Sequence, residues 1–315
     1  MNLLKGLKII YFLVMSEVKL AVKVFRDLEI EDFKILLALE KGMKRYQYVP
    51  SESIPFLSNI SPKEVEFRLG RLSEMRLIRR WVGSYVGYAL NRAGYDCLAL
   101  NALVKNDVLE AVGLPLGVGK ESNVYEGLTP EKERVAIKFH RLGSISFRNV
   151  KKLRGYVKRD ERVSWLSLAR IAAEREYKAL RILYPLKISV PKPIARNRHV
   201  IVMSIIEGTE LENLLEIPDS ERIFKDVLRN IRKAYEKAKI IHADLSGFNI
   251  LIKPEGEILI IDWPQYVTVN HPNADLLLKR DIRNVLTLFR RKANLEADLE
   301  KTVQYVKGHV KSLDL

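Results

Sequence analysis

The chain has 315 residues, 47% of them hydrophobic, which is enough for roughly two packed domains at about 150 residues each and excludes a disordered protein. Its 54 Lys and Arg residues outnumber its 39 Asp and Glu residues, for a formal net charge of +15. Such a charge favours polyanionic partners such as nucleic acid or a ribonucleoprotein; the alternative is a solvated basic surface. The single cysteine, Cys97, excludes an internal disulfide and a cysteine metal cluster and predicts a reducing, cytoplasmic setting.

The first residues imitate a short signal peptide, with Lys5 and Lys8 placed before an apolar run from Ile9 to Met15. The run is far shorter than the roughly 20 residues that cross a bilayer, and Ser16 to Lys19 is a poor cleavage site. We therefore expect no membrane contact. Residues 1–22 are either a small extension packed on the first domain, or translation starts at Met15.

Three helices are predicted in the next part of the chain. Apolar residues at near-helical spacing predict the first from Leu28 to Met43, and a second short helix is expected around Ser51 to Leu57. The third begins at Ser61, where serine caps the helix, proline occupies the first turn and Glu64 can close a capping box.

A basic, aromatic hairpin follows these helices, with two β-prone runs from Leu77 to Leu90 around a Gly83-Ser84 turn. Three helices and a hairpin describe a winged helix, whose third helix and wing usually meet nucleic acid. The candidate contacts are four arginines: Arg68 and Arg71, outside the packed face of the third helix, and Arg79 and Arg80 in the hairpin. The alternative is a protein-docking helical domain.

A helix from Leu98 to Val112 is expected to lead out of this module, and Gly113-Leu114-Pro115 is expected to break it. We place the domain boundary near residue 105. A glycine-bearing turn between two strands, from Leu116 to Gly127, comes next. Its glycines let the backbone approach phosphates, which Ser122 and Lys120 could contact, but it is not a Walker A loop.

The strand from Val135 to Phe139 carries a single lysine, Lys138, in the V-A-I-K pattern that pairs the α- and β-phosphates of ATP with a cation. A helix from Ser164 to Leu183 offers two carboxylates to hold that lysine. Glu176 shares its helical face with apolar residues, whereas Glu174 lies among polar ones. We therefore expect an ion pair between Lys138 and Glu176.

The strongest signal is a pair of polar residues, Asp244 and Asn249, in the D-x-x-x-x-N spacing of a kinase catalytic loop. The aspartate can orient the attacking hydroxyl and accept its proton, and the amide oxygen can bind magnesium without adding charge. Asp262 ends the next apolar strand, where a kinase places its metal-binding aspartate, and His242 is expected to hold the loop. Together with Lys138, these residues predict an ATP- and magnesium-dependent phosphotransferase.

From Met15 onward the chain resembles the RIO family of atypical serine/threonine kinases, in the subfamily with an amino-terminal winged helix. The resemblance implies an α+β protein in which a winged helix-turn-helix domain with its linker helix, residues 23–105, precedes a trimmed bilobal kinase domain, residues 106–315. The N-lobe would run to about residue 203 and the C-lobe would start at about residue 204. The resemblance rests on Gly42-Met43, Tyr48-Val49-Pro50, Gly119 to Tyr125, Ile241 to Asn249, the distinctive Asp262-Trp263-Pro264-Gln265, His271-Pro272-Asn273-Ala274 and Arg280-Asp281.

The resemblance also implies the site. The catalytic residues would be Asp244, as the base, and Lys138, which would meet the phosphates together with Ser122. Asn249 and Asp262 would bind Mg2+ or Mn2+. Glu121 and Glu176 would lie near Lys138, and the hinge from Met203 to Ile206 would meet adenine. The candidate nucleotide-binding residues are Gly117, Gly119, Lys120, Glu121, Ser122, Val124, Lys138, Glu176, Met203, Ser204 and Ile206.

The chain departs from ordinary protein kinases as RIO proteins do, because Trp263-Pro264 follows the metal aspartate and no Ala-Pro-Glu segment is present. Ser204 stands where a hinge glutamate is commoner, which leaves a backbone carbonyl contact. The resemblance implies a kinase, an ATPase or both, acting on an immature small ribosomal subunit or its rRNA.

Two other functions stay open. One is a nucleotide-gated RNA- or ribosome-binding module with vestigial catalysis. The other is a small-molecule phosphotransferase of the aminoglycoside-kinase type, which shares the spacing of His242, Asp244 and Asn249 but has the winged helix and Asp-Trp-Pro-Gln against it.

A basic segment from Arg141 to Arg159 contains seven basic residues and no acidic one. In RIO proteins this place is a loop near the nucleotide, so Ser144 and Ser146 are candidates for autophosphorylation. The alternative is an ordinary solvated basic loop.

Overall fold

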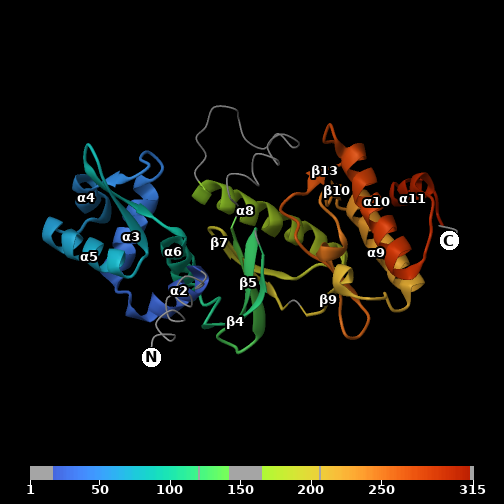
Figure 1. The fold of residues 1–315 in the computed structure, drawn as a ribbon, viewed down its shortest axis with the longest axis horizontal. Helices are drawn as coiled ribbons and strands as arrows, with labels where there is room; N and C mark the ends of the chain where they lie inside the picture. Colours follow the sequence, from blue (N-terminus) through green and yellow to red (C-terminus); the bar gives the residue numbers. More distant parts are fainter. Residues whose placement is uncertain (1–16, 120, 142–164, 206, 313–315) are drawn as a thin grey trace, which may run out of the picture. The chain divides into compact units, whose positions relative to one another are not determined.

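The computed structural model describes residues 17–119, 121–141, 165–205 and 207–312, and the chain divides into two compact units, residues 1–109 and 110–315 (Figure 1). The division falls close to the predicted boundary near residue 105. Each unit mixes helices with antiparallel sheet, which is the α+β class that the sequence predicts.

The first unit is a set of short helices with a small sheet. The three predicted helices and the hairpin are confirmed, and the second helix consists of a 3-10 turn, Ser51–Ser53, that continues into a short α-helix. The helices are α2 (Glu17–Val24), α3 (Ile30–Gly42), α4 (Ile54–Ser58), α5 (Pro62–Glu74) and α6 (Arg92–Lys105), and the strands β1 (Val49–Pro50), β2 (Ile78–Val82) and β3 (Val86–Leu90) pair in the order β1-β3-β2. Since α2 packs on α6 with Val18 and Ala21 fully buried, the chain from Glu17 belongs to this unit.

Polar residues fix where these helices start. Glu29 caps α3 in a reciprocal pair with Asp32, whose carboxylate accepts the Glu29 backbone N–H at 2.9 Å. Ser61 caps α5 as predicted and accepts the N–H of Glu64. The expected return bond from Glu64 is replaced by a contact at 2.7 Å with Nε of Arg68, one turn further along the helix.

The predicted helix from Leu98 to Val112 is wrong at both ends. α6 starts earlier because Asn91 caps it, accepting the Gly94 N–H at 3.0 Å, and it ends at Lys105, before the left-handed residue Asp107. Residues 111–118 then form a strand rather than a helix end. That strand is at the edge of its sheet, where a proline such as Pro115 costs no ladder hydrogen bond.

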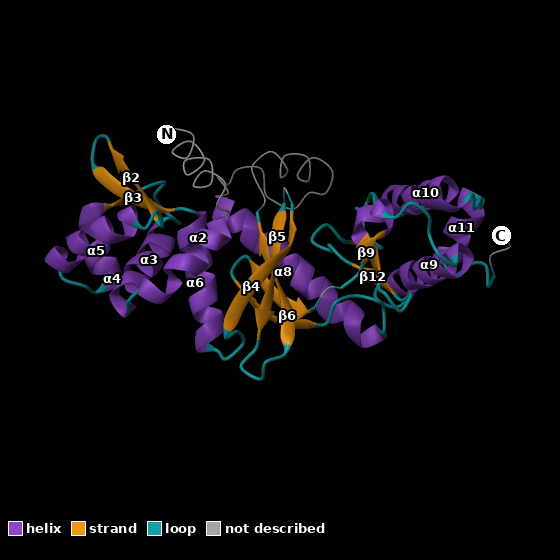
Figure 2. Ribbon diagram, turned by 60° about the horizontal axis from the view of Figure 1, so that its bottom comes forward, coloured by secondary structure: helices purple, strands orange, loops and turns teal. Residues whose placement is uncertain are grey.

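The N-lobe of the second unit is a five-stranded antiparallel sheet with one long helix beside it (Figure 2). The strands are β4 (Ala111–Val118), β5 (Ser122–Leu128), β6 (Arg134–His140), β8 (Val200–Ser204) and β7 (Pro193–Asn197), paired in the order β4-β5-β6-β8-β7. The helix α8 (Trp165–Leu183) packs on β6, β7 and β8. This arrangement sets α8 next to the strand that carries Lys138.

The C-lobe is mainly helical, and two small antiparallel sheets present the catalytic loops. Its helices are α9 (Ser220–Glu236), α10 (Ala274–Ala293) and α11 (Leu299–Val306); β9 (Thr209–Glu210), β11 (Ile250–Ile252) and β12 (Ile258–Ile260) form one sheet, and β10 (Ile240–Ile241) and β13 (Val267–Thr268) form the other. Phe224 and Phe289 pack edge to face in its core at 5.0 Å between ring centroids. No helix in the described part of the chain is long and apolar enough to cross a membrane.

Candidate active site

A cavity of about 340 Å³ lies in the second unit, between the glycine turn of the N-lobe and the loops of the C-lobe. Nine of the predicted nucleotide and metal residues line it, and they come from β4, β5, β6, α8, β8 and the segment around β11 and β12. The lining residues are Leu116, Gly117, Val118, Gly119, Ser122, Val124, Lys138, Glu176, Pro191, Met203, Gly208, Glu210, Phe248, Asn249, Leu251, Ile261 and Asp262.

The ammonium group of Lys138 is held between two carboxylates. Its Nζ lies 2.8 Å from Oε1 of Glu176 and 2.8 Å from Oδ1 of Asp262. The predicted pair with Glu176 is therefore present, and Glu174 is exposed, as the helical wheel predicts. The contact with Asp262 joins the β6 lysine to the segment after β12 and was not predicted.

These contacts decide the charges at the centre of the site. Burial by itself would lower the pKa of Lys138, which is only 4% exposed, but the charges of Asp262 and Glu176 outweigh it and raise that pKa. Burial would likewise raise the pKa of Glu176, and Lys138 and His140 reverse the effect and lower it. The lysine and the glutamate are both charged at neutral pH.

A buried histidine that the sequence did not single out completes this cluster. Nε2 of His140 lies 3.0 Å from Oε2 of Glu176, whereas Lys138 contacts the other carboxylate oxygen, Oε1. The contact is a close polar approach rather than a well-aligned hydrogen bond, because neither atom has a hydrogen-bond partner of good geometry among the described residues. His140 lies two residues after Lys138 on β6 and therefore on the same face of the sheet, so alternation along the strand could have identified it.

The backbone of the predicted catalytic loop is fixed from α10. The buried carboxylate of Asp281 accepts the N–H groups of Ala243 at 2.6 Å and Leu245 at 3.2 Å, on either side of Asp244. Arg280 donates to the carbonyl of Ala243, whose φ of 62° is rare for alanine. Burial raises the pKa of Asp281 to about 6, against the opposing effects of nearby positive charge and these N–H groups. The loop presents Asp244 outward, with 48% of its side chain exposed.

The residues predicted to bind a metal have the oxygen donors that such a site needs. Asn249 donates through Nδ2 to the carbonyl of Asp244 at 2.8 Å, so the geometry points its Oδ1 away from that bond. Asp262 has a φ of 67° and uses Oδ1 for Lys138, and no described residue bonds its Oδ2. One amide and one carboxylate oxygen facing the same cavity fit Mg2+, which prefers few protein oxygens and completes its shell with phosphate and water. No group of three or more His, Cys, Asp and Glu side chains is placed for a metal in the described residues, so the two-residue set is the candidate.

His242 supports this segment, as expected. Its Nε2 lies 3.0 Å from the carbonyl of Ile261, and its ring packs against Trp263 with 4.6 Å between centroids. The indole N–H of Trp263 in turn donates to the carbonyl of Ile260 at 3.2 Å. The histidine and the tryptophan thus hold the chain immediately before and after Asp262.

The glycine turn is open on its cavity side. A Cβ added to Gly117 would meet no protein atom within 4 Å, and Gly117 and Gly119 both line the cavity. Ser122, Val124 and Met203, which are predicted to bind the nucleotide, line the cavity.

Other predicted nucleotide residues are placed differently. Neither Glu121 nor Ser204 is part of the lining: the Glu121 carbonyl accepts the N–H of Arg141, and the Ser204 hydroxyl accepts the N–H of Lys192 at 3.0 Å. The two carboxylates at Lys138 are Glu176 and Asp262, so Glu121 is not its partner in this structure. Lys120, Ile206, Ser144 and Ser146 lie outside the described residues.

Sequence reasoning missed the apolar walls of the cavity. Leu251 lies in β11, Ile261 directly follows β12, and Phe248 lies inside the D-x-x-x-x-N motif itself. Gly208 also lines the cavity with a φ of 133°, and a Cβ there would lie 2.6 Å from the carbonyl oxygen of Ile252. The period of two in the strands could have indicated the first two residues, whereas the close approach at Gly208 depends on the folded chain.

The four arginines predicted to meet nucleic acid divide into two kinds. Arg68 was predicted to stand outside the packed face of α5, but it is only 7% exposed and binds Glu29 at 2.9 Å as well as Glu64. Arg71 is also tied to Glu29. These two arginines join α5 to the start of α3, so their charge is neutralised inside the unit.

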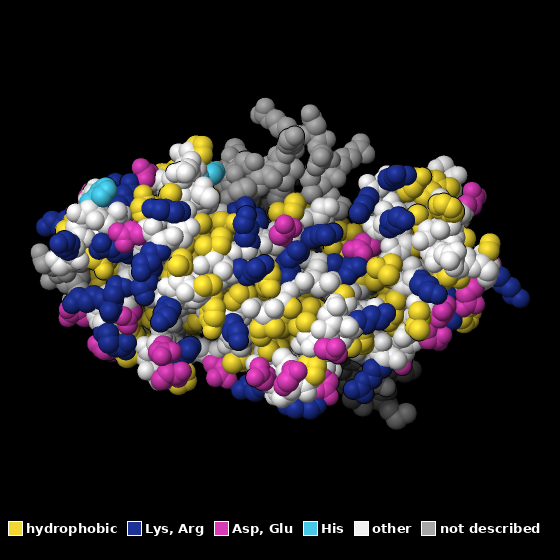
Figure 3. Space-filling model, turned by 180° about the vertical axis from the view of Figure 1, so that it is seen from behind, with side chains coloured by type: hydrophobic (Ala, Val, Ile, Leu, Met, Phe, Trp, Pro, Cys, Tyr) yellow, Lys and Arg dark blue, Asp and Glu magenta, His cyan; other side chains and the backbone are white. Residues whose placement is uncertain are grey.

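Arg79 and Arg80 are exposed on β2. As neighbours in a strand they face opposite sides of the hairpin, so one surface cannot use both equally. On one face of the molecule, Lys and Arg side chains are spread among acidic ones rather than gathered into a single block (Figure 3).

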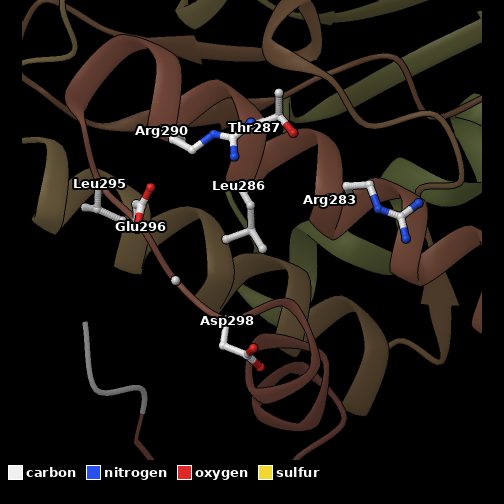
Figure 4. A pocket seen from close by; sticks show the side chains of 8 residues that line it. Arg283, Leu286, Thr287, Arg290, Leu295, Glu296 and Asp298 are labelled. Carbon is white, nitrogen blue, oxygen red and sulfur yellow. The ribbon is translucent and has the colours of Figure 1, made fainter.

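A second hollow of about 620 Å³ lies in the C-lobe and shares no residue with the cavity above. Figure 4 shows side chains of α10 on one side and the segment before α11 on the other. Its lining combines basic and acidic groups and lacks the predicted catalytic set: Arg283, Leu286, Thr287, Arg290, Leu295, Glu296, Ala297 and Asp298.

Comparison with known proteins decides the family. The profile of the RIO domain matches residues 123–302, more than half of the chain, and the profile of the Rio2 N-terminal domain matches residues 25–106. The chain belongs to the RIO kinase family. It is a RIO-type kinase of the Rio2 group, and its first unit is the winged-helix domain of that group.

Individual Rio2 proteins match over most of the chain. It is 40% identical over 273 residues to the RIO-type serine/threonine-protein kinase Rio2 of Methanocaldococcus jannaschii, covering 84% of this chain and 99% of that protein. It is 37% identical to the serine/threonine-protein kinase rio2 of Dictyostelium discoideum, but it spans only 53% of that longer protein. The Rio2 kinase of Chaetomium thermophilum, in an ADP/Mg2+-phosphoaspartate complex, superposes with a TM-score of 0.78 at 32% identity, covering 91% of this chain and 89% of that one.

Proposed function

We propose that this RIO kinase transfers the γ-phosphoryl group of ATP to a serine or threonine hydroxyl, and that it acts in the cytoplasm on an immature small ribosomal subunit. The observation that carries the proposal is that Lys138, Glu176, Asn249 and Asp262 line one cavity, while Asp244 is fixed on the same loop as Asn249. Phosphoryl transfer needs four kinds of group: a cation that binds the phosphates, a carboxylate that holds this cation, ligands for the metal, and a base.

The lysine is suited to the phosphates of the nucleotide. An ammonium group has three donors, and the contacts with Glu176 and Asp262 use two of them. The remaining donor of Lys138 can face the α- and β-phosphates. Because Glu176 is held by His140 as well, the lysine keeps its position when a nucleotide competes for its charge.

Asn249 and Asp262 would hold Mg2+, or Mn2+ in its place. When bound, the metal neutralises charge on the phosphates. The work of the protein is to fix the two oxygen donors, and it does so through the bond from Asn249 to the Asp244 carbonyl and the support of Asp262 by its neighbours. The crystallised Chaetomium relative was described with ADP and Mg2+, which supports this assignment.

Asp244 would orient the attacking hydroxyl and accept its proton. The hydroxyl oxygen forms a bond to the γ-phosphorus while the bond from that phosphorus to the β–γ bridging oxygen breaks, and ADP leaves. The exposure of Asp244 suits a group that must meet a large substrate, and Nη2 of Arg280 lies 3.8 Å from its Oδ1.

The charge of the chain and the first unit both favour such a partner. A net charge of +15 favours a polyanionic particle, and the wing of the winged helix exposes Arg79 and Arg80. A single exposed arginine on each side of the hairpin fits contacts to phosphates that position the protein.

The test is ATP turnover with and without purified immature small subunits, using ATP labelled in the γ-phosphate. We expect the particle to raise turnover at least about tenfold and label to appear on protein as stable phosphoserine or phosphothreonine. Label that hydroxylamine releases would instead indicate a phosphoaspartate, the group in the Chaetomium Rio2 complex, and hence an ATPase cycle. Turnover that is equal with and without the particle, with no label on protein, would contradict the proposal.

A second candidate function is a nucleotide-gated RNA- or ribosome-binding module with vestigial catalysis. It is favoured by the short connection after the metal aspartate, since only residues 263–273 separate Asp262 from α10, too few for a peptide-binding activation segment. This candidate predicts that ATP changes the affinity for the particle while almost no product forms. Rapid multiple turnover on the particle would exclude it.

A further inference from the structure

Two consecutive residues of α8 contact two different parts of the active site. Glu176 points inward to Lys138 on β6, at 2.8 Å. Arg175, about a quarter of a helical turn away, points to the segment that follows Asp262. Figure 1 shows α8 running along the N-lobe sheet and on towards the C-lobe. One rigid helix therefore touches both the strand of the phosphate-binding lysine and the segment of the metal-binding aspartate.

The contacts of Arg175 are made to backbone carbonyls. Its Nε donates to the carbonyl of Pro264 at 2.9 Å, its Nη2 donates to the carbonyl of Tyr266, and its guanidinium lies over the Tyr266 ring at 4.6 Å from the centroid. A guanidinium presents a planar fork of donors, so one side chain can join two carbonyls and stack on a ring at once. An ammonium group could not do all three.

The segment that Arg175 holds is anchored at its near end as well, where Trp263 packs against His242. It starts at Asp262, whose left-handed φ of 67° must be imposed by its surroundings, and it ends where β13 pairs with β10. Within it, Trp263 donates to the carbonyl of Ile260 at 3.2 Å. The indole fixes the near end and Arg175 fixes the next turn, so the direction of the Asp262 carboxylate depends on both.

We propose that Arg175 is a positioning residue that couples α8 to the metal-binding segment, so that Lys138 and Asp262 reach their working positions together. Arg175 holds the carbonyls of Pro264 and Tyr266, and these hold Asp262 in the orientation in which Oδ2 is open to a divalent cation. The inference rests on the proposed function, because it assumes that Asp262 binds the metal of a bound nucleotide. Groups that orient a metal ligand from behind typically change metal affinity by about 10- to 100-fold when they are removed.

The experiment measures ADP binding to the full chain by calorimetry, once in EDTA and then at rising Mg2+ concentration. The variants are Arg175→Gln, Arg175→Lys and, as matched control, Arg181→Gln, an exposed arginine on the same helix. We expect all four proteins to bind ADP within about twofold of each other in EDTA. Arg175→Gln should then need about tenfold more Mg2+ than the wild type, Arg175→Lys should also need more, and Arg181→Gln should match the wild type.

Three outcomes would overturn the inference. The first is an unchanged Mg2+ requirement in Arg175→Gln, or in Arg175→Lys should the glutamine variant fail to fold. The second is a loss of ADP affinity that is equal with and without Mg2+, because that would show a general structural role. The third is a wild-type protein whose affinity for ADP does not depend on Mg2+. This result would contradict the proposed metal site itself, and it differs from the first two because it is seen in the wild type without any variant.

Discussion

Replacing Glu176 with glutamine tests the buried cluster at the centre of the site. The change keeps the shape of the side chain and removes its charge. Among the described residues, Lys138 then keeps the carboxylate of Asp262, and His140 faces an amide. Removing one partner from a buried ion pair costs about 3–5 kcal/mol when the other charge is left uncompensated. Since Asp262 still compensates Lys138, we expect the lower end, about 3 kcal/mol.

This loss is large enough to measure by calorimetry. At about 2–4 °C for each kcal/mol in a domain of this size, the melting temperature of the kinase unit should fall by roughly 6–12 °C. Turnover should fall by about a hundredfold, because a displaced lysine no longer meets the phosphates in the productive geometry.

Glu174→Gln is the matched control, since Glu174 lies on the same helix and is exposed. It should change the unfolding free energy by no more than about 0.5 kcal/mol and leave turnover unchanged. Equal effects from the two substitutions would refute the reasoning, because they would show that burial and pairing at Glu176 contribute nothing.

Three further predictions concern other groups of the structure. His140→Ala leaves Oε2 of Glu176 buried without the imidazole beside it and should lower the free energy of unfolding, measured by chemical denaturation, by about 1–3 kcal/mol. His140→Gln should recover part of this loss, because its amide can donate a hydrogen bond. No recovery would show that His140 stabilises the site by packing and not by its polar contact. Arg68→Ala should destabilise the first unit by about 3 kcal/mol, because the fully buried carboxylate of Asp32 loses one of its positively charged partners. A change under about 0.5 kcal/mol would contradict the role of Arg68 in joining α5 to α3. Burial raises the pKa of Asp281 from 3.8 to about 6, so the stability that Asp281 contributes is complete below pH 4 and is lost as the pH rises through 6. The loss is about 3 kcal/mol, at about 1.4 kcal/mol for each unit of pKa shift. Asp281→Asn should flatten this part of the curve of stability against pH, and an unchanged slope would show that Asp281 does not cause it.

Local patterns in the sequence were enough to find the chemistry. The spacing of Asp244 and Asn249, the lysine within an apolar strand and the inward face of α8 at Glu176 each depend on a few neighbouring residues. The helices of the first unit were predictable for the same reason, because their caps and apolar spacing are local. The predicted end of α6 was wrong because apolar residues continue past Lys105 into the strand β4. The spacing of these apolar residues does not by itself distinguish a helix from a strand.

Contacts between segments that are distant in the sequence could not be predicted from local patterns. Arg68 has the spacing of an exposed helix residue, but Glu29 and Asp32 approach it from another helix and bury it. The contacts of Arg175 with the segment after Asp262 likewise join parts of the chain that only the fold brings together. Long, charged side chains are the least predictable, since the same residue can cover a surface or join two elements depending on what folds against it.

The most direct test of the central claim is a comparison of ATP turnover and ADP binding in the wild type and in Asp244→Asn. The amide keeps the size of the side chain but cannot accept the proton of the attacking hydroxyl. We expect turnover to fall by at least about a hundredfold while the affinity for ADP with Mg2+ stays within about twofold, because Asp244 does not line the nucleotide cavity. Undiminished turnover in Asp244→Asn would contradict the assignment of the catalytic base and with it the proposed phosphotransferase mechanism.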